Sequence, residues 1–488
     1  MLEATTVKGD GRRDATKAET GARIKEAFER LKANRWRMAA ASAQERIARL
    51  VSLRHAILRR RGELEEALRA DYRKPSAEAE LTELQPVLAE IKHTIKHLRH
   101  WMEPVPVSSP PTLFGTRSML RYEPKGVVLL LSPWNYPFNL LLAPLVSAIA
   151  AGNCVMCRPS DKVPATSRFV ASLLQEVFPE NEVAIFTGPS WIATLMLELP
   201  FDHVMFTGST RIGRDVMAAA SKHLASVTLE LGGQCPVVID ETADVEAAAE
   251  RVVWGKYLNA GQTCVAPNHV FVHESRATEF IEVAKRTVAQ RYGGTEDERR
   301  KSEDLCRIVD PGSVRKLHDL IERSVAAGAT LEIGGVHDVE ERYLAPTILS
   351  GVKDGSPIMQ DEIFGPVLPI LSYRNLDDVL GSIRSRGKPL ALYVFSSDRS
   401  SVERILAGTT AGGSVVNNVI LHLANPELPF GGVGESGLGS YHGFYGFKNF
   451  SHERAVLVQG RPALLGMFYP PYTRKVRRAI GLVTRFFS

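Results

Sequence analysis

The chain has 488 residues, more than one hydrophobic core usually spans, which predicts two or three structural units. Its 44% hydrophobic and 24% charged residues exclude extensive intrinsic disorder. The formal net charge of +5 is small and is not concentrated in a long basic block, which argues against nucleic acid as a partner.

The first residues, MLEATTVKGDGRRD, lack the apolar core of a secretory signal, and residues 1–20 are predicted to form a flexible arm. Five cysteines are too few and too scattered for a disulfide framework, and they predict a reducing, cytoplasmic environment. The stretch from Gly126 to Cys157 carries no charge and resembles a membrane span in hydropathy alone. The prolines within it would break one continuous helix, so we do not expect it to cross a membrane.

Apolar residues recur at helical spacing from Ala39 to Leu68 and again from Leu81 to Leu98, which predicts two amphipathic helices. After the proline-rich linker EPVPVSSPP, the predicted strands GVVLLL, CVMCR, EVAIFTG, HVMFTGS and SVTLEL alternate with helices, the first of which ends at Gly152. This alternation predicts a doubly wound parallel sheet with helices on both faces. A second series from about Asp244, with strands such as NHVFVH, LEIGG and ALYVFS, predicts a second α/β domain.

The segment FTGSTRIG joins a predicted strand to a helix, the place where parallel sheets bind ligands. Gly208, Ser209 and Gly213 would let backbone N–H groups there hold a pyrophosphate. The G-x-G-x-x-G fingerprint is missing, so an ordinary strand-to-helix connection is an equal alternative.

The five cysteines differ in their surroundings. Cys154 and Cys157 lie three apart in a predicted strand, so they point to opposite faces and are predicted to be packed core thiols. Cys235 and Cys306 have no cysteine or histidine partner at ligand spacing, and no metal site is predicted. Cys264 follows a Gly-Gln-Thr run without apolar periodicity. Spacing alone favours an inert thiol there over a nucleophile.

Six motifs, in their order between about residues 40 and 457, resemble the NAD(P)-dependent aldehyde dehydrogenase superfamily: SPWNYP, FTGSTRIG, ELGGQCP, NAGQTC, EIFGP and LPFGGVGESGLGSYHG. The segments WNYPFNL, GQTCVAP, YHG, FSHERAV and YPPY are most similar to class 3 enzymes, which include fatty aldehyde and coniferyl aldehyde dehydrogenases. The resemblance implies a Rossmann-like cofactor domain over residues 21–230 and a second α/β catalytic domain over 231–420. It also implies a small β arm for oligomerisation, built from residues 111–125 and 421–457.

The same resemblance implies the chemistry. Cys264 would attack the aldehyde, the thiohemiacetal would lose a hydride to the nicotinamide, and the thioester would be hydrolysed to the carboxylic acid. Asn135 would stabilise the oxyanion together with the backbone N–H of Cys264. Glu230 would act as general base for water. Without the family, a paired structural acid and a turn former are the favoured interpretations of Glu230 and Asn135.

The resemblance also assigns a cofactor site to NAD or NADP. The family positions that contact the cofactor correspond to Pro133, Trp134, Arg158, Ser160, Asp161, Gly208, Ser209, Ile212, Leu231, Glu362 and Phe364. Relatives commonly carry lysine and glutamate where this chain has Arg158 and Asp161. Arg158 could pair with a 2′-phosphate, and the shorter Asp161 would leave room for it or accept from a free 2′-hydroxyl. Use of both cofactors is therefore predicted.

By family position, Tyr136, Trp254 and Phe430 would line the substrate entrance and favour aromatic or medium- to long-chain aliphatic aldehydes, although each ring suits core packing equally well. Two rival functions stay open. One is a coenzyme A-acylating dehydrogenase, in which a thiol resolves the thioester. The other is a scaffold that binds a partner without catalysis.

Residues 458–488 form a predicted basic amphipathic tail, too charged to span a bilayer. Packing against the enzyme or a subunit partner is favoured. Weak contact with a membrane surface is the alternative, because some long-chain enzymes of this class are membrane attached. Class 3 enzymes usually form dimers, so the expectation is a cytoplasmic homodimer, with peripheral membrane contact as an alternative.

Overall fold

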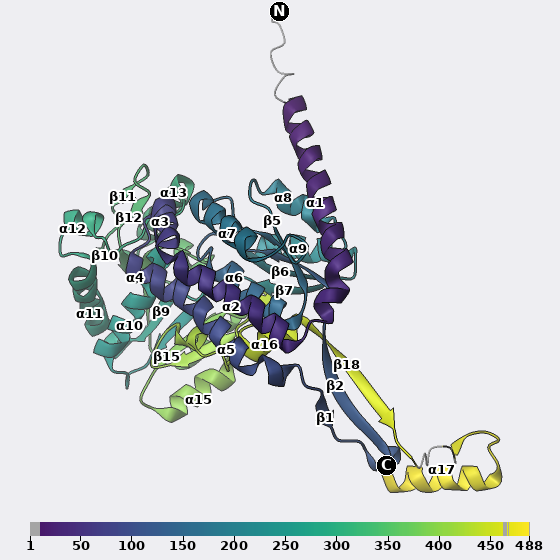
Figure 1. Cartoon of the computed structure of the whole chain (residues 1–488). Coiled ribbons are helices and arrows are strands. Elements are labelled where there is room, and N and C mark those ends of the chain that lie inside the picture. The colour runs from purple at the N-terminus through teal and green to yellow at the C-terminus, as the bar shows by residue number, and fades with distance from the viewer. Residues whose placement is uncertain (1–9, 462–465, 467, 488) are drawn as a thin grey trace, which may run out of the picture.

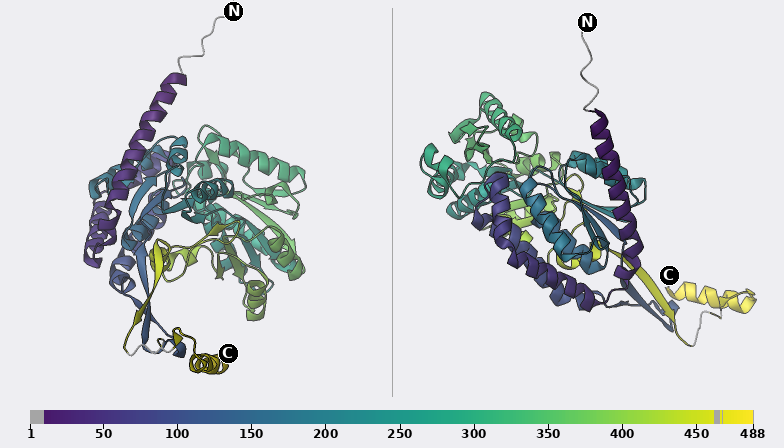
Figure 2. Two further views of the ribbon diagram at one scale, coloured as in Figure 1. Left: turned by 90° about the vertical axis from the view of Figure 1, so that its right-hand side faces the viewer. Right: turned by 45° about the horizontal axis from the view of Figure 1, so that its top comes forward.

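The computed structural model describes residues 10–461, 466 and 468–487. Two sheets, one from each half of the chain, form the body with helices around them, and a narrow three-stranded arm projects from it (Figures 1 and 2). No helix within these ranges is long and apolar enough to cross a membrane.

Helices precede the first sheet: α1 (Asp10–Ala39), α2 (Ala43–Arg59), α3 (Arg61–Tyr72), α4 (Ser76–Ala79), a π-helical turn (Glu80–Leu84) and α5 (Gln85–Trp101). Residues 10–20 of the predicted flexible arm are helical within α1, and the first nine residues lie outside the described ranges. The helix predicted from Ala39 to Leu68 is two helices. Ser42 forms a capping box with Glu45 at the start of α2, and α2 ends at Arg59, where α3 follows.

The first sheet has the strand order β17-β7-β6-β3-β4-β5. Its strands are β3 (Val127–Leu131), β4 (Cys154–Arg158), β5 (Val183–Ile185), β6 (His203–Thr207), β7 (Ser226–Glu230) and β17 (Gly437–Leu438). The associated helices are α6 (Asn139–Ala151), α7 (Pro164–Val177), α8 (Trp191–Leu197) and α9 (Thr210–Ser221). All neighbours are parallel except β17, which runs antiparallel to β7. The strands predicted for this half are confirmed, as is the end of α6 at Gly152, which has a φ of 92°.

The second sheet has the order β10-β13-β14-β9-β8-β15-β16, and only its edge strand β10 is antiparallel to its neighbour. Its strands are β8 (Pro236–Ile239), β9 (His269–His273), β10 (Thr330–Ile333), β13 (Thr347–Ser350), β14 (Val367–Tyr373), β15 (Ala391–Phe395) and β16 (Gly413–Val416). The helices are α10 (Val245–Tyr257), α11 (Glu274–Tyr292), α12 (Glu296–Lys301), α13 (Pro311–Ala326), α14 (Leu376–Ser385) and α15 (Arg399–Gly408). A separate ribbon pairs β11 (His337–Asp338) with β12 (Tyr343–Leu344). The predicted second α/β domain is thus present.

The arm contains β1 (Val105–Val107), β2 (Thr116–Pro124) and β18 (Ser451–Gln459), which pair antiparallel. Before β18, α16 (Gly443–Asn449) packs against α5 and α6. Helix α17 (Arg474–Phe487) lies near the tip of the arm, away from the body (Figure 1). The segment after residue 421 therefore serves both the arm and the first sheet, through β17.

Short 3-10 helices complete the fold: Pro111–Leu113, Leu258–Gly261, Pro357–Met359 and Leu421–Ala424. One continuous apolar core joins both sheets and the N-terminal helices. Cys154 and Cys157 are fully buried in β4 as free thiols, which confirms that this C-x-x-C pair packs in the core.

Candidate active site

A cavity of about 910 Å³ opens where the carboxyl ends of β6 and β7 face segments of the second domain. It collects predicted site residues that are far apart in the chain: Pro133, Trp134, Asn135, Gly208, Ser209, Glu230, Leu231, Cys264, Glu362 and Phe364. A position at the carboxyl edge of a parallel sheet agrees with the general location of ligand sites in this fold class.

Cys264 lies on a loop that directly follows three left-handed residues, Asn259, Ala260 and Gly261, with φ of 55°, 52° and 73°. This costly backbone is held by the buried amide of Asn259, which donates to the carbonyl oxygens of Asn135 (3.0 Å) and Gln262 (3.1 Å). Of the five cysteines, Cys264 is the one residue that is only partly buried. It lines the cavity, so the structure excludes a thiol enclosed in the core.

Burial raises the pKa of the Cys264 thiol well above its usual 9, and the neighbouring Glu362 carboxyl raises it further. The backbone N–H of Cys264 faces its own sulfur and acts in the opposite direction. The resting group is therefore a thiol, and forming the nucleophilic thiolate requires a base nearby.

Glu230 ends β7, where it pairs with Gly437 of β17. Its side chain is 3% exposed, and neither carboxylate oxygen has a hydrogen-bond partner in the described structure. Burial raises the pKa of this carboxyl well above its usual 4.5. An ion-paired or capping role does not fit these observations, whereas a proton-exchanging group does.

The side-chain amide of Asn135 is buried and donates to the carbonyl oxygen of Gln262 over 3.1 Å. An amide nitrogen carries two hydrogens, so one N–H remains for a ligand. The Asn135 backbone carbonyl accepts from the Tyr72 hydroxyl at 3.1 Å and from the Asn259 amide. Hydrogen bonds therefore hold Asn135 both at its backbone carbonyl and at its side-chain amide.

A buried ion pair supports this part of the site. The Lys74 ammonium lies 3.1 Å from one carboxylate oxygen of Glu83, and both side chains are fully buried. The other Glu83 oxygen accepts from the backbone N–H groups of Phe138 (3.2 Å) and Asn139 (2.9 Å), at the start of α6. Glu83 thus supplies the cap that α6 lacks in its own sequence. Sequence reasoning missed this pair, because no local motif links Lys74, Glu83 and α6.

The turn after β6 has the features of a phosphate site. Gly208 follows the strand, and Ser209 stands at the N-cap of α9 without using its side chain as a cap. A side chain at Gly208 would collide with the Phe206 ring, whose nearest atom lies 2.5 Å from a Cβ placed there. The backbone N–H groups at this helix start are available to an anion.

Glu362 and Phe364 enter the cavity from the second domain. One Glu362 oxygen lies 1.9 Å from where a Cβ on Gly232 would stand, so only glycine permits this approach. The other oxygen has no partner in the described structure. Burial raises the pKa of Glu362 to about 8. Phe364 meets Trp134 edge to face at 5.4 Å. A carboxyl with one oxygen left without a partner, an aromatic wall and an anion-binding turn together fit a dinucleotide.

Four predicted cofactor residues do not line this cavity. Arg158 donates to Asp161 and to the carbonyl oxygen of Gly188, both at 2.9 Å, at the carboxyl end of β4. Ser160 is buried beside them, and Ile212 lies 41% exposed on α9. Since β4 adjoins β3, the Arg158–Asp161 pair stands on the same edge of the sheet as the cavity.

The three predicted substrate residues also lie outside the cavity lining. Tyr136 is buried and its hydroxyl is 2.5 Å from the hydroxyl of Thr263. Phe430 is buried, with its ring stacked on His442 at 5.3 Å. Trp254 is partly buried on α10 and packs against the core. Tyr136 contacts the residue next to Cys264, whereas Trp254 and Phe430 have packing roles in this arrangement.

Some residues in the cavity lining or buried near it were not anticipated from sequence. Glu435 and Ser436 line it from the segment before β17. Lys256 is fully buried near Glu362, and burial lowers its pKa to about 7. A glycine-rich turn and a lysine in an apolar helix are weak signals without the fold.

Known proteins share this architecture. The chain is similar to the solved substrate-bound state of Staphylococcus aureus AldH, with a TM-score of 0.90, 39% identity, and coverage of 94% of this chain and 99% of that one. It is 42% identical over 428 residues to the 4,4'-diaponeurosporen-aldehyde dehydrogenase of Staphylococcus aureus (strain NCTC 8325 / PS 47), covering 88% of this chain and 92% of that protein. It is 40% identical over 442 residues to the dimeric NADP-preferring aldehyde dehydrogenase of Rattus norvegicus, covering 90% and 95%.

The fold is thus that of an aldehyde-oxidising dehydrogenase with a dinucleotide cofactor. Residues 10–456 match the model of the aldehyde dehydrogenase family, and the chain belongs to that family. It is an NAD(P)-dependent aldehyde dehydrogenase of the class 3 type, as the sequence motifs predicted.

Proposed function

We propose that this enzyme oxidises an apolar aldehyde, aromatic or medium- to long-chain aliphatic, to the carboxylic acid through a thioester on Cys264. The observation that carries the proposal is the unpartnered Glu230 carboxyl in the same cavity as the partly exposed Cys264. A buried carboxyl without hydrogen bonds is costly unless it serves the reaction.

In the first step, Cys264 gives its thiol proton to the Glu230 carboxylate, and its sulfur bonds to the carbonyl carbon as the C=O double bond opens. The carbonyl oxygen becomes an oxyanion, which the free N–H of Asn135 and the backbone N–H of Cys264 stabilise. Losing one such donor typically costs about 2.7 to 4 kcal/mol of transition-state stabilisation. The fixed position of Asn135 supports this role, because a donor already in place needs no reorganisation during the reaction.

A bound NAD(P) would supply the acceptor for the hydride that the tetrahedral carbon has to lose. Gly208 and Ser209 would hold its phosphates, and Glu362 with Phe364 would hold the nicotinamide end. Arg158 and Asp161 would meet the adenosine ribose, and their pairing supports use of both NAD and NADP. Because Arg158 and Asp161 pair with each other, the adenosine ribose would face neither an unpaired positive charge nor an unpaired negative charge.

In the second step, Glu230 takes a proton from water, which attacks the thioester carbon and releases the acid and the Cys264 thiolate. The raised pKa of Glu230 supports this role because it brings the carboxyl closer to the range in which a base both accepts and returns a proton.

The two steps are separable by experiment. Glu230→Gln is expected to give a burst of one NAD(P)H per active site and then a slow steady rate, whereas Cys264→Ala gives no burst. Acyl-enzyme trapped in Glu230→Gln should appear by mass spectrometry as the acyl mass on Cys264. Undiminished turnover by Cys264→Ala would contradict the nucleophile. Acyl-CoA as the product when coenzyme A is added would favour the acylating alternative.

The preference for apolar aldehydes rests on the ring of Tyr136, whose hydroxyl contacts Thr263 next to Cys264, and on a relative named for 4,4'-diaponeurosporen-aldehyde. A series of benzaldehyde-type, cinnamyl-type and C6 to C16 aldehydes, each with NAD and NADP, tests it. We expect kcat/KM to rise with apolar chain length. Higher kcat/KM for a small polar aldehyde such as glyceraldehyde would contradict the proposal.

We also propose a homodimer that uses the arm. Strand β18 is an edge strand, and apolar side chains on the arm are exposed, among them Val105, Val107 and Leu457 at 41%, 42% and 52%. A relative is described as dimeric. Light scattering should give the mass of a dimer for the full chain. For a Leu457→Glu variant it should give a lower average mass, because the dimer dissociates more readily. An unchanged mass would contradict the assignment of the arm.

A weak contact of α17 with an anionic membrane surface completes the proposal. The helix contains no acidic residue, and its basic side chains Arg474, Lys475, Arg477 and Arg478 are exposed. Apolar Ile480 and Leu482 are exposed too, so the helix does not bury them on the body of its own chain. Flotation with phosphatidylserine vesicles should distinguish the full chain from one cut after Gly460. Equal flotation would contradict the contact.

A further inference from the structure

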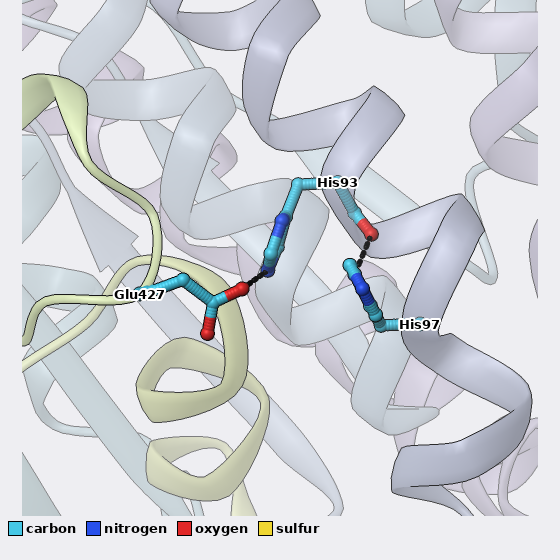
Figure 3. Close-up of side chains that lie close together, drawn as sticks. All are labelled: His93, His97 and Glu427. Carbon is cyan, nitrogen blue, oxygen red and sulfur yellow. Dashed lines mark hydrogen bonds and ion pairs between the residues drawn. The ribbon is translucent and has the colours of Figure 1, made fainter.

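Two histidines and a glutamate converge outside the proposed active site (Figure 3). His93 and His97 lie one turn apart on α5, and Glu427 lies in the segment that leads from the 3-10 helix at 421–424 to Phe430. One ligand atom of each residue lies within 4.8 Å of the others, and His93 Nε2 is 3.7 Å from a Glu427 oxygen. Within the described ranges, no other trio of histidine, cysteine or acidic side chains meets this spacing.

The ring of His97 is already oriented as in a metal ligand. Its Nδ1 lies 2.9 Å from the backbone carbonyl oxygen of His93, and a carbonyl only accepts, so Nδ1 carries the proton. The lone pair is then on Nε2. Metal-binding histidines commonly donate their other ring N–H to a carbonyl in this manner.

Neighbouring rings restrict both imidazoles. His93 and His97 have ring centroids 4.3 Å apart, and Trp101 stacks on His97 at 5.9 Å with an interplanar angle of 18°. Glu427 differs, because its side chain is 71% exposed and can move. The two imidazole rings are already held in place. Only the Glu427 carboxylate would have to move when an ion binds.

We propose that His93, His97 and Glu427 bind one divalent transition-metal ion of the zinc type, with solvent in the remaining position. Imidazole nitrogen and carboxylate oxygen suit such ions, and three protein ligands plus water is a common zinc set. Tetrahedral bonds of about 2.0 to 2.1 Å place ligand atoms about 3.3 Å apart. The 3.7 Å between His93 and Glu427 is close to that value.

The ion would tie α5 to the segment that carries Phe430. This segment already lies against the start of α16, since the Pro426 carbonyl oxygen is 2.2 Å from where a Cβ on Gly443 would stand. The backbone N–H of Gly443 in turn donates to Glu90 of α5, at 3.0 Å. A bound ion would add a second link between α5 and the 425–443 region, beside the Glu90–Gly443 hydrogen bond. The site is therefore expected to stabilise this region, and its existence does not depend on the proposed substrate or mechanism.

Zinc binding by untagged protein tests the proposal, with a Cys264→Ser background to remove the competing thiol. Titration calorimetry should give one zinc per chain. His97→Phe, which keeps the ring stacked on Trp101 without a ligand nitrogen, should weaken binding by more than about 100-fold, because losing a group that only orients a ligand already costs about 10- to 100-fold. Glu427→Gln, which keeps one oxygen ligand, should weaken binding by about tenfold. Zinc should also raise the melting temperature of the background protein but not of His97→Phe.

The matched control is His100→Ala, one turn further along α5. His100 forms an exposed pair with Glu103 at 3.2 Å and belongs to no three-residue cluster among the described residues, so its loss should leave zinc affinity unchanged. The proposal is overturned if His97→Phe binds zinc as tightly as its background, if His100→Ala weakens binding equally, or if no zinc binds at micromolar concentrations.

Discussion

The buried pair of Lys74 and Glu83 permits a quantitative prediction. Glu83→Gln keeps the shape of the side chain but removes the charge that faces the Lys74 ammonium and the N–H groups at the start of α6. Both side chains are fully buried, so water cannot replace the lost partner. Breaking such a pair on one side costs about 3 to 5 kcal/mol in the free energy of unfolding.

The loss in the free energy of unfolding depends on which of the two charged groups remains without its partner. In Glu83→Gln the ammonium stays buried and unpaired, which is the costly case. In Lys74→Met the carboxyl can take up a proton and keeps both backbone N–H donors, so a smaller loss is expected. The double variant Lys74→Met/Glu83→Gln leaves no unpaired charge and should be more stable than Glu83→Gln alone.

Urea unfolding followed by circular dichroism measures these three variants. Glu303→Gln is the matched control, because Glu303 pairs with Arg69 on the exposed surface and should give no measurable change. The kinetic readout is a fall in kcat of about ten- to hundredfold in Glu83→Gln with little change in cofactor KM, since α6 follows the Asn135 loop. Additive losses in the double variant would refute the reasoning.

Three further predictions concern charge. Because the pKa of Cys264 lies well above 9, its iodoacetamide alkylation should accelerate about tenfold per pH unit between pH 7 and 9, and a plateau near pH 7 would contradict this. Burial raises the pKa of Glu90 from 4.5 to about 7, so the folded protein binds this proton more tightly and stability should fall as pH rises between those values. Glu90→Gln should remove about 3 kcal/mol of that dependence in urea unfolding, and identical pH profiles would exclude it. Asp161→Asn should free Arg158 and raise kcat/KM for NADP relative to NAD about tenfold, equivalent to about 1.4 kcal/mol, whereas an unchanged ratio would mean that Arg158 does not contact the phosphate.

Local patterns predicted much of the fold. Apolar runs such as GVVLLL and CVMCR became β3 and β4, and Gly152 ended α6 as a left-handed residue. These features depend on near neighbours in the chain. The break between α2 and α3, the helix over residues 10–20 and the pairing of β17 with β7 depend on tertiary contacts or weak local signals, and sequence reasoning missed them.

The candidate site shows the same division. Family motifs predicted ten residues that line the cavity, because each motif is short and carries its own turn or strand end, whereas the other seven predicted site residues lie outside its lining. Contacts between motifs were not predictable. Neither the Arg158–Asp161 pair nor the Lys74–Glu83 support has a sequence signature, since pairing depends on side-chain directions that only the packed structure defines.

The electrostatics of the cavity explain why one carboxyl must exchange protons in the proposed mechanism. Burial is the largest cause that raises the pKa of Cys264, and Glu362 and Glu230 raise it further, so a thiolate forms more readily when these carboxyls are uncharged. Glu362 has a backbone partner in Gly233, whereas both oxygens of Glu230 are free. Glu230 can therefore hold a proton while the thiolate attacks and release it before water is activated. Burial of the unpaired Glu230 carboxyl destabilises the fold, but it also raises the pKa of this group. The raised pKa is what lets Glu230 hold a proton during attack by the thiolate and later take a proton from water.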